Sequence, residues 1–323
     1  MIDRRTFVAS AAASALFAPA VHAQAYPNRF LRIIVPFAAG GATDVMARVI
    51  GARLSEVWGQ QIVVEARGGA GGNIGAQMVA QADPDGYTLL LSSVGQAVNR
   101  FLYATLPYDP IADFEPVTLV CVQPNIMVVP NASLAKSVAE FIAYGKANPD
   151  KITYGSGGVG TSVHLCGELF KRMTGIEMRH VPYRGAGPAL QDVIAGRLDA
   201  IFDNIAGSLP QVRAGNARGL AVTTLKRSGA APDVPTLAEA GVPGFDVSAW
   251  FGFYAPAKTP KEIVAKLNAD IVAALGHPPV KEKLEQLGAD VVGSTPEGLA
   301  QHIKAEMDKW GPVIRDAGIR IDG

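Results

Sequence analysis

The sequence predicts an α/β protein with a mostly parallel β-sheet in each of two halves, and three observations support this. Short apolar runs alternate with segments in which apolar residues recur at helical spacing, a pattern typical of parallel strands covered by helices. A strand, a glycine turn and a helix start follow one another twice, at residues 32–50 and 152–165. The chain has 323 residues, and a chain of this length usually divides into two domains.

The first strand–turn–helix unit begins with residues 33–35 (IIV), a β-branched run typical of a strand buried on both faces. Pro36 has no N–H for a sheet and therefore ends the strand. Glycines at 40 and 41 permit a sharp turn, and Thr43 and Asp44 are typical of a helix start. Free N–H groups at such a start carry partial positive charge and suit a phosphate or a carboxylate.

The alternation continues along the chain. Turn residues 83–86 (DPDG) close a helix, and two apolar runs within 114–130, separated at 123–125 (QPN), are expected to carry the chain into the second half. Expected strands cover residues 61–65, 87–92, 151–154, 178–182, 198–202, 220–224 and 249–256. Expected helices cover residues 74–82, 138–147, 161–173, 188–195, 260–275, 280–287 and 296–317.

The amino terminus is typical of a secretory signal peptide, which we expect to cover residues 1–23. A short basic start precedes an alanine-rich apolar stretch, and residues 21–23 (VHA) form a small-x-small cleavage pattern. The pair Arg4 and Arg5 leaves two export routes open, the twin-arginine route and the general one. We expect a periplasmic mature protein that begins near Gln24.

The charge balance argues against several classes of partner. Without Arg4, Arg5 and Asp3 of the signal, 27 basic and 28 acidic residues remain. The mature chain is therefore near neutral, with no basic tract suited to nucleic acid or an anionic membrane. No later apolar run has the length of a membrane span, so we expect a soluble protein. We also expect it to be a monomer.

The residue spacing offers no metal site. Cys121 lies in an apolar run and Cys166 on an expected helix. An exported protein permits a disulfide, but one of this size does not need it, so a bridge and two buried thiols both stay open. The histidines of the mature chain are scattered, and no pair lies at i, i+4. We expect neither a metal nor a cofactor.

The second glycine turn, residues 155–160 (GSGGVG), is open to three interpretations. Its glycines match the G-x-G-x-x-G fingerprint of dinucleotide sites. That fingerprint also needs an acidic residue at the end of the next strand, where residues 181–184 read VPYR. Arg184 could face a 2′-phosphate, but an exported protein has little access to nicotinamide cofactors, so we disfavour this interpretation.

A hydrolase is the second interpretation. Ser156 lacks the G-x-S-x-G frame, because residue 154 is tyrosine. His164 follows on the helix, and Asp199 or Asp203 would have to complete a triad. This spacing follows no known arrangement, and helix capping by Ser156 with helix packing by His164 explains the same residues.

The third interpretation, which we favour, is a binding cleft. The two glycine turns, one in each half, face each other and offer N–H groups and hydroxyls to the anionic end of a small ligand. Ligands of open α/β sheets bind outside the carboxyl ends of the strands, where both turns would lie. This interpretation predicts a binding protein rather than an enzyme.

Nearly the whole mature chain resembles the Bug-type (TctC-like) receptors, the periplasmic solute-binding subunits of tripartite tricarboxylate transporters. The matching blocks are residues 36–44 (PFAAGGATD), 106–117 (LPYDPIADFEPV), 154–165 (YGSGGVGTSVHL), 180–185 (HVPYRG), 235–241 (PTLAEAG) and 250–260 (WFGFYAPAKTP). The resemblance implies a two-lobed periplasmic-binding fold, type II-like, that closes on its ligand about a hinge. It also implies small organic anions, often di- or tricarboxylates, held by backbone amides, hydroxyls and ordered water.

By position, the resemblance implies ligand-binding residues in both lobes. From the first lobe these are Phe37, Ala39, Gly40, Gly41, Thr43 and Asp44, with Gln96 from the segment after the third strand. From the second lobe they are Ser156, Gly157, Gly158, Thr161, Ser162 and His164, with Tyr183, Arg184 and Asp203 near the cleft. Gln96 and Arg100 depart from the residues usual in the family. We expect one lobe at 24–124 and 249–323, the return being mainly helical, and the other at 125–248.

Two charged residues have open roles. Asp44 either caps the helix and fixes the loop or contacts a ligand amino group, which would indicate an amino acid. Arg184 pairs either with a distal ligand carboxylate or with Asp203. The expected function is capture of a small carboxylate (a di- or tricarboxylate, or an acidic amino acid) for membrane permease subunits. The alternatives are a receptor for a sensor kinase and a secreted hydrolase that uses Ser156.

Overall fold

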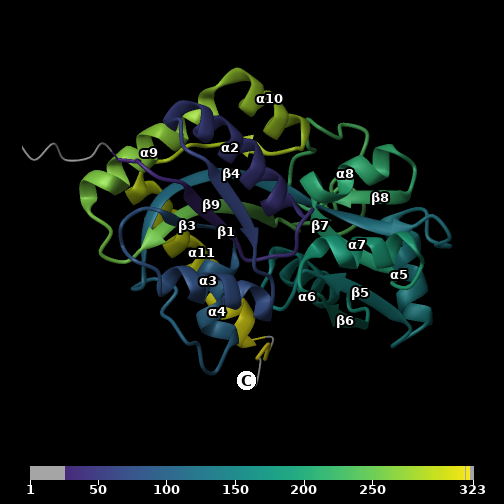
Figure 1. Cartoon of the computed structure of the whole chain (residues 1–323). Helices are drawn as coiled ribbons and strands as arrows, with labels where there is room; N and C mark the ends of the chain where they lie inside the picture. Colours follow the sequence, from purple (N-terminus) through teal and green to yellow (C-terminus); the bar gives the residue numbers. More distant parts are fainter. Residues whose placement is uncertain (1–25, 317, 321–323) are drawn as a thin grey trace, which may run out of the picture.

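The computed structural model describes residues 26–316 and 318–320, so the expected signal peptide lies outside the described residues. The described chain forms two α/β lobes joined by long strands (Figure 1). Among these residues, none of the helices combines the length and the apolar character that crossing a membrane requires.

The first lobe is built on parallel strands near the amino terminus. β1 (Leu31–Val35) lies between β2 (Ile62–Ala66) and β3 (Thr88–Ser92) and is parallel to both. Ile33, Ile34 and Val35 are buried, as expected for a central strand. The helices that follow these strands are α2 (Ala42–Trp58), the short η2 (Ala70–Gly72), α3 (Asn73–Ala80) and α4 (Gly95–Leu102).

The second lobe repeats this design. β5 (Ile152–Ser156) lies between β6 (Met178–Pro182) and β7 (Ala200–Asn204) and is parallel to both. Its helices are α5 (Val138–Ala147), α6 (Ser162–Thr174), α7 (Ala186–Ile194) and α8 (Ile205–Arg213). The unit β1–turn–α2 in the first lobe thus has a counterpart, β5–turn–α6, in the second.

Two long strands join the lobes. β4 (Phe114–Pro130) pairs antiparallel with β9 (Ser248–Pro256) over its first part, and with β7 and β8 (Ala217–Val222) over its second. Residues 114–130 therefore form one continuous strand, which runs from one lobe into the other in Figure 1. Because β3 and β9 are also antiparallel, the sheets are mixed rather than mostly parallel.

The carboxyl-terminal helices pack on the first lobe. They are α9 (Lys261–Gly276), α10 (Pro278–Gln286) and α11 (Pro296–Asp316), and the short β10 (Asp290–Val291) lies beside β4. Leu267 and Leu284 share one apolar core with Ile33 and Met46. Segments from both ends of the chain thus stabilise each other, while the lobe boundaries at residues 124 and 248 stay a prediction.

Helices α4 and α8 are not expected from the sequence. Residues 205–213 contain Gly207 and Pro210, both poor helix formers. Ile205 and Leu209, one helical turn apart, are nevertheless buried, so tertiary packing outweighs local propensity. Cys121 and Cys166 are buried free thiols, which decides between the two states left open by the sequence.

Candidate functional site

The two glycine turns meet at a small cavity between the lobes. The predicted residues that line it are Phe37, Gly41, Thr43, Gly157, Thr161 and Ser162. Ala42, Ser93, Val163, Ala186, Asn204 and Phe251 complete the lining. The space among these residues is about 370 Å³, of which about 30 Å³ admits the centre of a water molecule. The lobes are therefore close together in this structure.

The lobes touch directly beside this cavity. The backbone N–H of Ala38 donates to the carbonyl oxygen of Arg184 at 3.0 Å. A Cβ atom at Gly185 would lie 2.6 Å from the Ala38 nitrogen, so the absence of a side chain there permits the close approach. This contact defines a closed arrangement of the lobes.

The start of α2 presents backbone N–H groups to the cavity. Gly41 is the N-cap residue, and no side-chain hydrogen bond caps this helix end. Ala42 and Thr43 of the first turn line the cavity, and the Thr43 hydroxyl has no partner among the described residues. Free N–H groups and a free hydroxyl at a helix N-terminus suit an anionic oxygen.

Asp44 holds the first turn in place. Its carboxylate accepts from the Gly40 N–H at 3.0 Å and from the Arg48 guanidinium at 3.0 Å. The side chain is buried and lies outside the cavity lining. Gly40 has a φ of 82°, a left-handed conformation that favours glycine. The geometry therefore supports the role of Asp44 in fixing the loop, rather than contact with a ligand amino group.

Thr161 organises the second turn and caps α6. Its Oγ1 accepts from the His164 N–H at 3.3 Å and donates to the Gly158 carbonyl at 2.7 Å. Gly158 has a φ of 123°, which an L side chain rarely adopts. Behind the turn, the Ser156 Oγ accepts from the Gly158 N–H at 3.0 Å. Gly157 lies between these fixed points and lines the cavity.

Asn204 and Ser93 are cavity residues that the sequence analysis missed. The Asn204 Nδ2 donates to the Ser162 Oγ and to the Asn125 Oδ1, both at 3.0 Å. Because the Ser162 oxygen accepts this bond, its own proton is available to a ligand. Asn204 ends β7 and Ser93 follows β3, so the carboxyl end of a strand was the available signal for both.

Several predicted residues lie outside the cavity lining. Ala39 is exposed on the first turn. Gln96 is buried in α4, where its Nε2 donates to the Pro110 carbonyl at 2.8 Å. The Tyr183 hydroxyl donates to the Asp192 carboxylate at 2.5 Å. The polar groups of Gln96 and Tyr183 therefore serve the scaffold around the site.

Arg184 and Asp203 do not pair with each other. Arg184 is exposed, and the ion pairs found among the described residues do not include it. Asp203 is buried and accepts from the Ser208 hydroxyl at 2.7 Å. Burial raises the pKa of Asp203 to about 6, although Ser208 and the Asn204 N–H oppose this rise. Neither residue lines the cavity.

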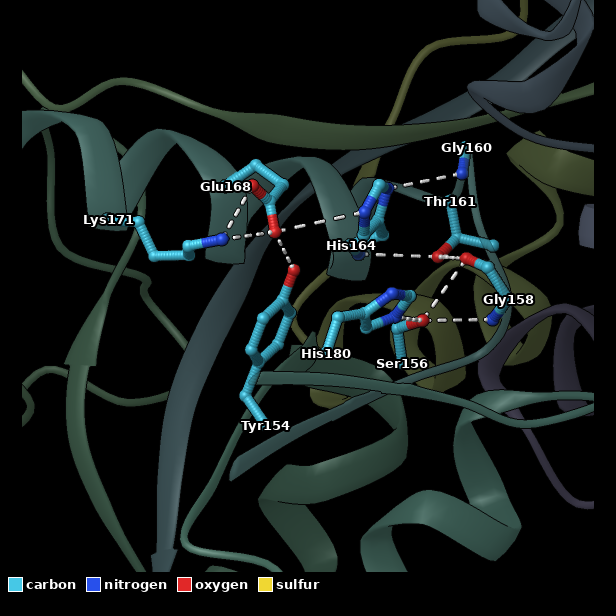
Figure 2. Close-up of polar contacts among 9 residues, drawn as sticks. All are labelled: Tyr154, Ser156, Gly158, Gly160, Thr161, His164, Glu168, Lys171 and His180. Atoms are coloured by element: carbon cyan, nitrogen blue, oxygen red, sulfur yellow. Dashed lines mark hydrogen bonds and ion pairs between the residues drawn. The ribbon is translucent and has the colours of Figure 1, made fainter. Parts of the chain in front are cut away.

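A buried polar network lies behind the second turn (Figure 2). The His164 Nδ1 accepts from the Gly160 N–H at 3.3 Å, and the His180 Nε2 lies 2.6 Å from the Ser156 Oγ. The two imidazole rings are 4.3 Å apart. Burial lowers the pKa of His164 to about 4 and that of His180 to about 3. Both rings are therefore neutral at pH 7.

The Ser156–His180 contact is not a hydrolase site. Ser156 is 0% exposed, so a substrate has no access to its oxygen. The Asp199 carboxylate accepts from the Thr153 hydroxyl, and the Asp203 carboxylate accepts from the Ser208 hydroxyl. The triad considered from the sequence is therefore not formed. Among the described residues, no group of His, Cys, Asp or Glu side chains is placed to hold a metal ion.

A larger apolar cavity lies within the first lobe. About 310 Å³ of it admits the centre of a water molecule. Phe114, Tyr254 and Met307 are in its lining, with the exposed Arg100 and Lys304. Its walls belong to one lobe, and they lack the several convergent polar groups of a small-anion site. The cavity between the lobes is therefore the candidate site.

Comparison with known proteins places the chain in a family. The family model for the tripartite tricarboxylate transporter family receptor matches residues 46–319. The chain belongs to this family. BugT of Bordetella pertussis is 39% identical to it over 311 residues, which cover 96% of this chain and 95% of BugT. This finding confirms the Bug-type resemblance.

Two solved structures agree with the fold and the class of function. An R. palustris protein solved with adipate is 43% identical, with a TM-score of 0.89 over 92% of this chain and 100% of that chain. MatC from Rhodopseudomonas palustris, with bound malate, is 37% identical, with a TM-score of 0.86 over 90% and 100%. The chain is thus a two-lobed periplasmic solute-binding protein of a receptor family, not an enzyme.

Proposed function

We propose that this receptor captures a small dicarboxylate between its lobes and presents it to the permease subunits of a tripartite transporter. The observation that carries the proposal is the convergence of two helix N-termini, from α2 and α6, on one cavity. No Lys or Arg among the described residues lines that cavity. Backbone N–H groups and hydroxyls hold an anionic oxygen without a cation.

The lining favours a dicarboxylate over an acidic amino acid. A ligand ammonium group needs an acceptor, and no Asp or Glu among the described residues lines the cavity. Asp44 is nearest in the sequence, but its oxygens already bind Gly40 and Arg48. The relatives solved with adipate and malate support the same class of ligand.

Export and hinge closure complete the proposal. Residues 1–23 direct export, and the mature chain works in the periplasm from near Gln24. The lobes, 24–124 with 249–323 and 125–248, move about β4 and β9, which connect them. Intact mass of the exported protein tests the first part, and retention of residues 1–23 would contradict it.

Thermal melting of the mature protein tests the ligand. The panel is adipate, malate, citrate and glutamate, with native mass spectrometry of freshly purified protein to detect a bound acid. Ligand at a hundred times its Kd stabilises a protein by about 2.7 kcal/mol. We expect adipate or malate to raise the melting temperature. A shift with glutamate alone would overturn the dicarboxylate assignment, and loss of labelled-adipate uptake without the receptor tests the permease partnership.

A further inference from the structure

We infer that His180 is a positioning residue for the ligand-binding turn at residues 156–161, acting through Ser156 and together with His164. The inference rests on the proposed function, because it concerns the turn that lines the cavity. His180 itself is not in the cavity lining. Its effect on the ligand therefore passes through the backbone of the turn.

The Ser156 hydroxyl is the link between His180 and the turn (Figure 2). Its oxygen accepts from the Gly158 N–H at 3.0 Å and lies 2.6 Å from the His180 Nε2. Whichever ring nitrogen of His180 carries the proton, the Ser156 hydroxyl is held by His180 on one side and by Gly158 on the other. Ser156 is fully buried, so losing this contact would leave polar groups without water to replace it.

His164 holds the other end of the same turn. Its Nδ1 accepts from the Gly160 N–H at 3.3 Å. His164 thus holds the Gly160 amide directly, and His180 supports the Gly158 amide through Ser156. Gly157, before both amides, lines the cavity. Glycine has the greatest backbone freedom of any residue. A turn with three glycines among residues 156–161 therefore needs such external contacts to keep its free N–H groups pointing toward the cavity.

The histidine rings are in turn held by β5 and α6. Tyr154 stacks on His180 with ring centres 4.9 Å apart. The Tyr154 hydroxyl donates to Glu168 at 2.5 Å, and Glu168 pairs with Lys171 at 3.0 Å. This network has no hydrogen bond of its own to the turn, and the Glu168 carboxylate approaches the His164 Nε2 only to 4.0 Å, beyond hydrogen-bond distance. Tyr154→Phe is therefore a matched control, because it keeps the stacked ring and removes the distant hydroxyl.

Calorimetry of the mature protein with adipate, and with malate, tests the inference. We expect Ser156→Ala and His180→Leu each to weaken binding of whichever acid binds the wild type by about tenfold, the effect of one lost hydrogen bond. His180→Gln, which returns a polar group near the Nε2 position, should restore the Kd to within about threefold. Tyr154→Phe should lower the melting temperature and leave the Kd unchanged. Unchanged affinity in both Ser156→Ala and His180→Leu would overturn the inference.

Amide hydrogen exchange provides a readout that needs no ligand. In Ser156→Ala and in His180→Leu we expect faster exchange at the Gly158 N–H and unchanged exchange at the Gly175 N–H, which bonds to Lys171 at the far end of α6. Equal protection of Gly158 in either variant and the wild type would contradict the inference. If neither acid binds the wild type, the proposed ligand class fails while this measurement still decides the role of Ser156. If His180→Leu does not fold, His180→Asn, whose shorter side chain does not reach the Ser156 Oγ, replaces it in both measurements.

Discussion

The backbone N–H of Ala38 in the first lobe donates to the carbonyl oxygen of Arg184 in the second, at 3.0 Å. This bond joins the lobes beside the cavity through backbone atoms alone. The Arg184 side chain is exposed and takes no part in it. The segment at 184–185 therefore matters for closure through its backbone rather than through its charge.

Gly185→Ala should block closure without unfolding either lobe. A methyl group there would lie 2.6 Å from the Ala38 nitrogen, across the lobe contact. We expect adipate binding to weaken by at least about tenfold, with the melting temperature of the free protein nearly unchanged. Gly187→Ala is the control, because its Cβ would lie 3.8 Å from the Ala39 oxygen. Equal Kd values for the two variants in calorimetry would contradict this account.

Gly41→Val should fold and fail to bind. Gly41 has a φ of −78°, which other residues adopt freely, and a Cβ there would meet only the Ala38 oxygen, at 3.6 Å. The valine side chain would instead occupy the space where a ligand oxygen binds the start of α2. Circular dichroism should be that of the wild type, and calorimetry should detect no adipate binding. Wild-type affinity would show that the oxygen lies elsewhere.

Asp203→Asn should stabilise the protein at pH 7.5. Burial raises the folded-state pKa of Asp203 to about 6, above the value of about 3.9 in an unfolded chain. The ionised carboxylate therefore costs stability at pH 7.5, on the order of 3 kcal/mol. Asparagine keeps an oxygen for the Ser208 hydroxyl. Urea unfolding measures the increase in the free energy of unfolding. Ser208→Ala should instead lower this free energy. The adipate Kd should not change, because Asp203 lies outside the cavity lining.

The lowered pKa values of His164 and His180 predict that the free energy of unfolding decreases as the pH falls from about 6.5 to about 4. The pKa of His164 is about 4 in the folded protein and about 6.5 in an unfolded chain. Within this window the unfolded state binds a proton that the folded state excludes, so unfolding becomes easier as the pH falls. His180 acts in the same direction.

Asp203 opposes the histidines in the same window. Its carboxyl group keeps a proton in the folded state up to about pH 6, so it adds stability as the pH falls toward 4. The free energy of unfolding should therefore depend on pH more steeply in Asp203→Asn than in the wild type. Urea unfolding at half-unit pH intervals measures both slopes. A shallower slope in the variant would contradict the assignment.

The sequence predicts the strand–turn–helix units and, through them, half of the cavity lining. These units follow from local signals: Pro36 ends a strand, glycines turn the chain, and Thr161 starts a helix. Asn204, Ser93 and Phe251 come from other strands, and only the tertiary fold brings them to the same cavity. The end of a strand could mark Asn204 and Ser93 as candidates, but no local signal shows that they reach the same cavity.

The roles of the charged residues depend on geometry in the same way. Asp44 could have faced a ligand, but its hydrogen bond from the Gly40 N–H supports the loop role. Asp203 and Arg184 were candidates for an ion pair, but Asp203 is buried and Arg184 is exposed, so they do not pair. The family resemblance made these residues candidates by their position, whereas their partners follow from packing.

The most direct test of the central claim compares the adipate Kd of Thr43→Val with that of Arg184→Ala by calorimetry. Thr43 is preferable to Thr161, because the Thr161 hydroxyl also caps α6. If neutral donors hold the ligand, Thr43→Val loses one hydrogen bond to a charged group, about 1.5–3 kcal/mol, and binding weakens about ten- to a hundredfold. Arg184→Ala should stay within about threefold of the wild type. Wild-type affinity in Thr43→Val together with lost binding in Arg184→Ala would contradict the account and assign the site to a salt bridge.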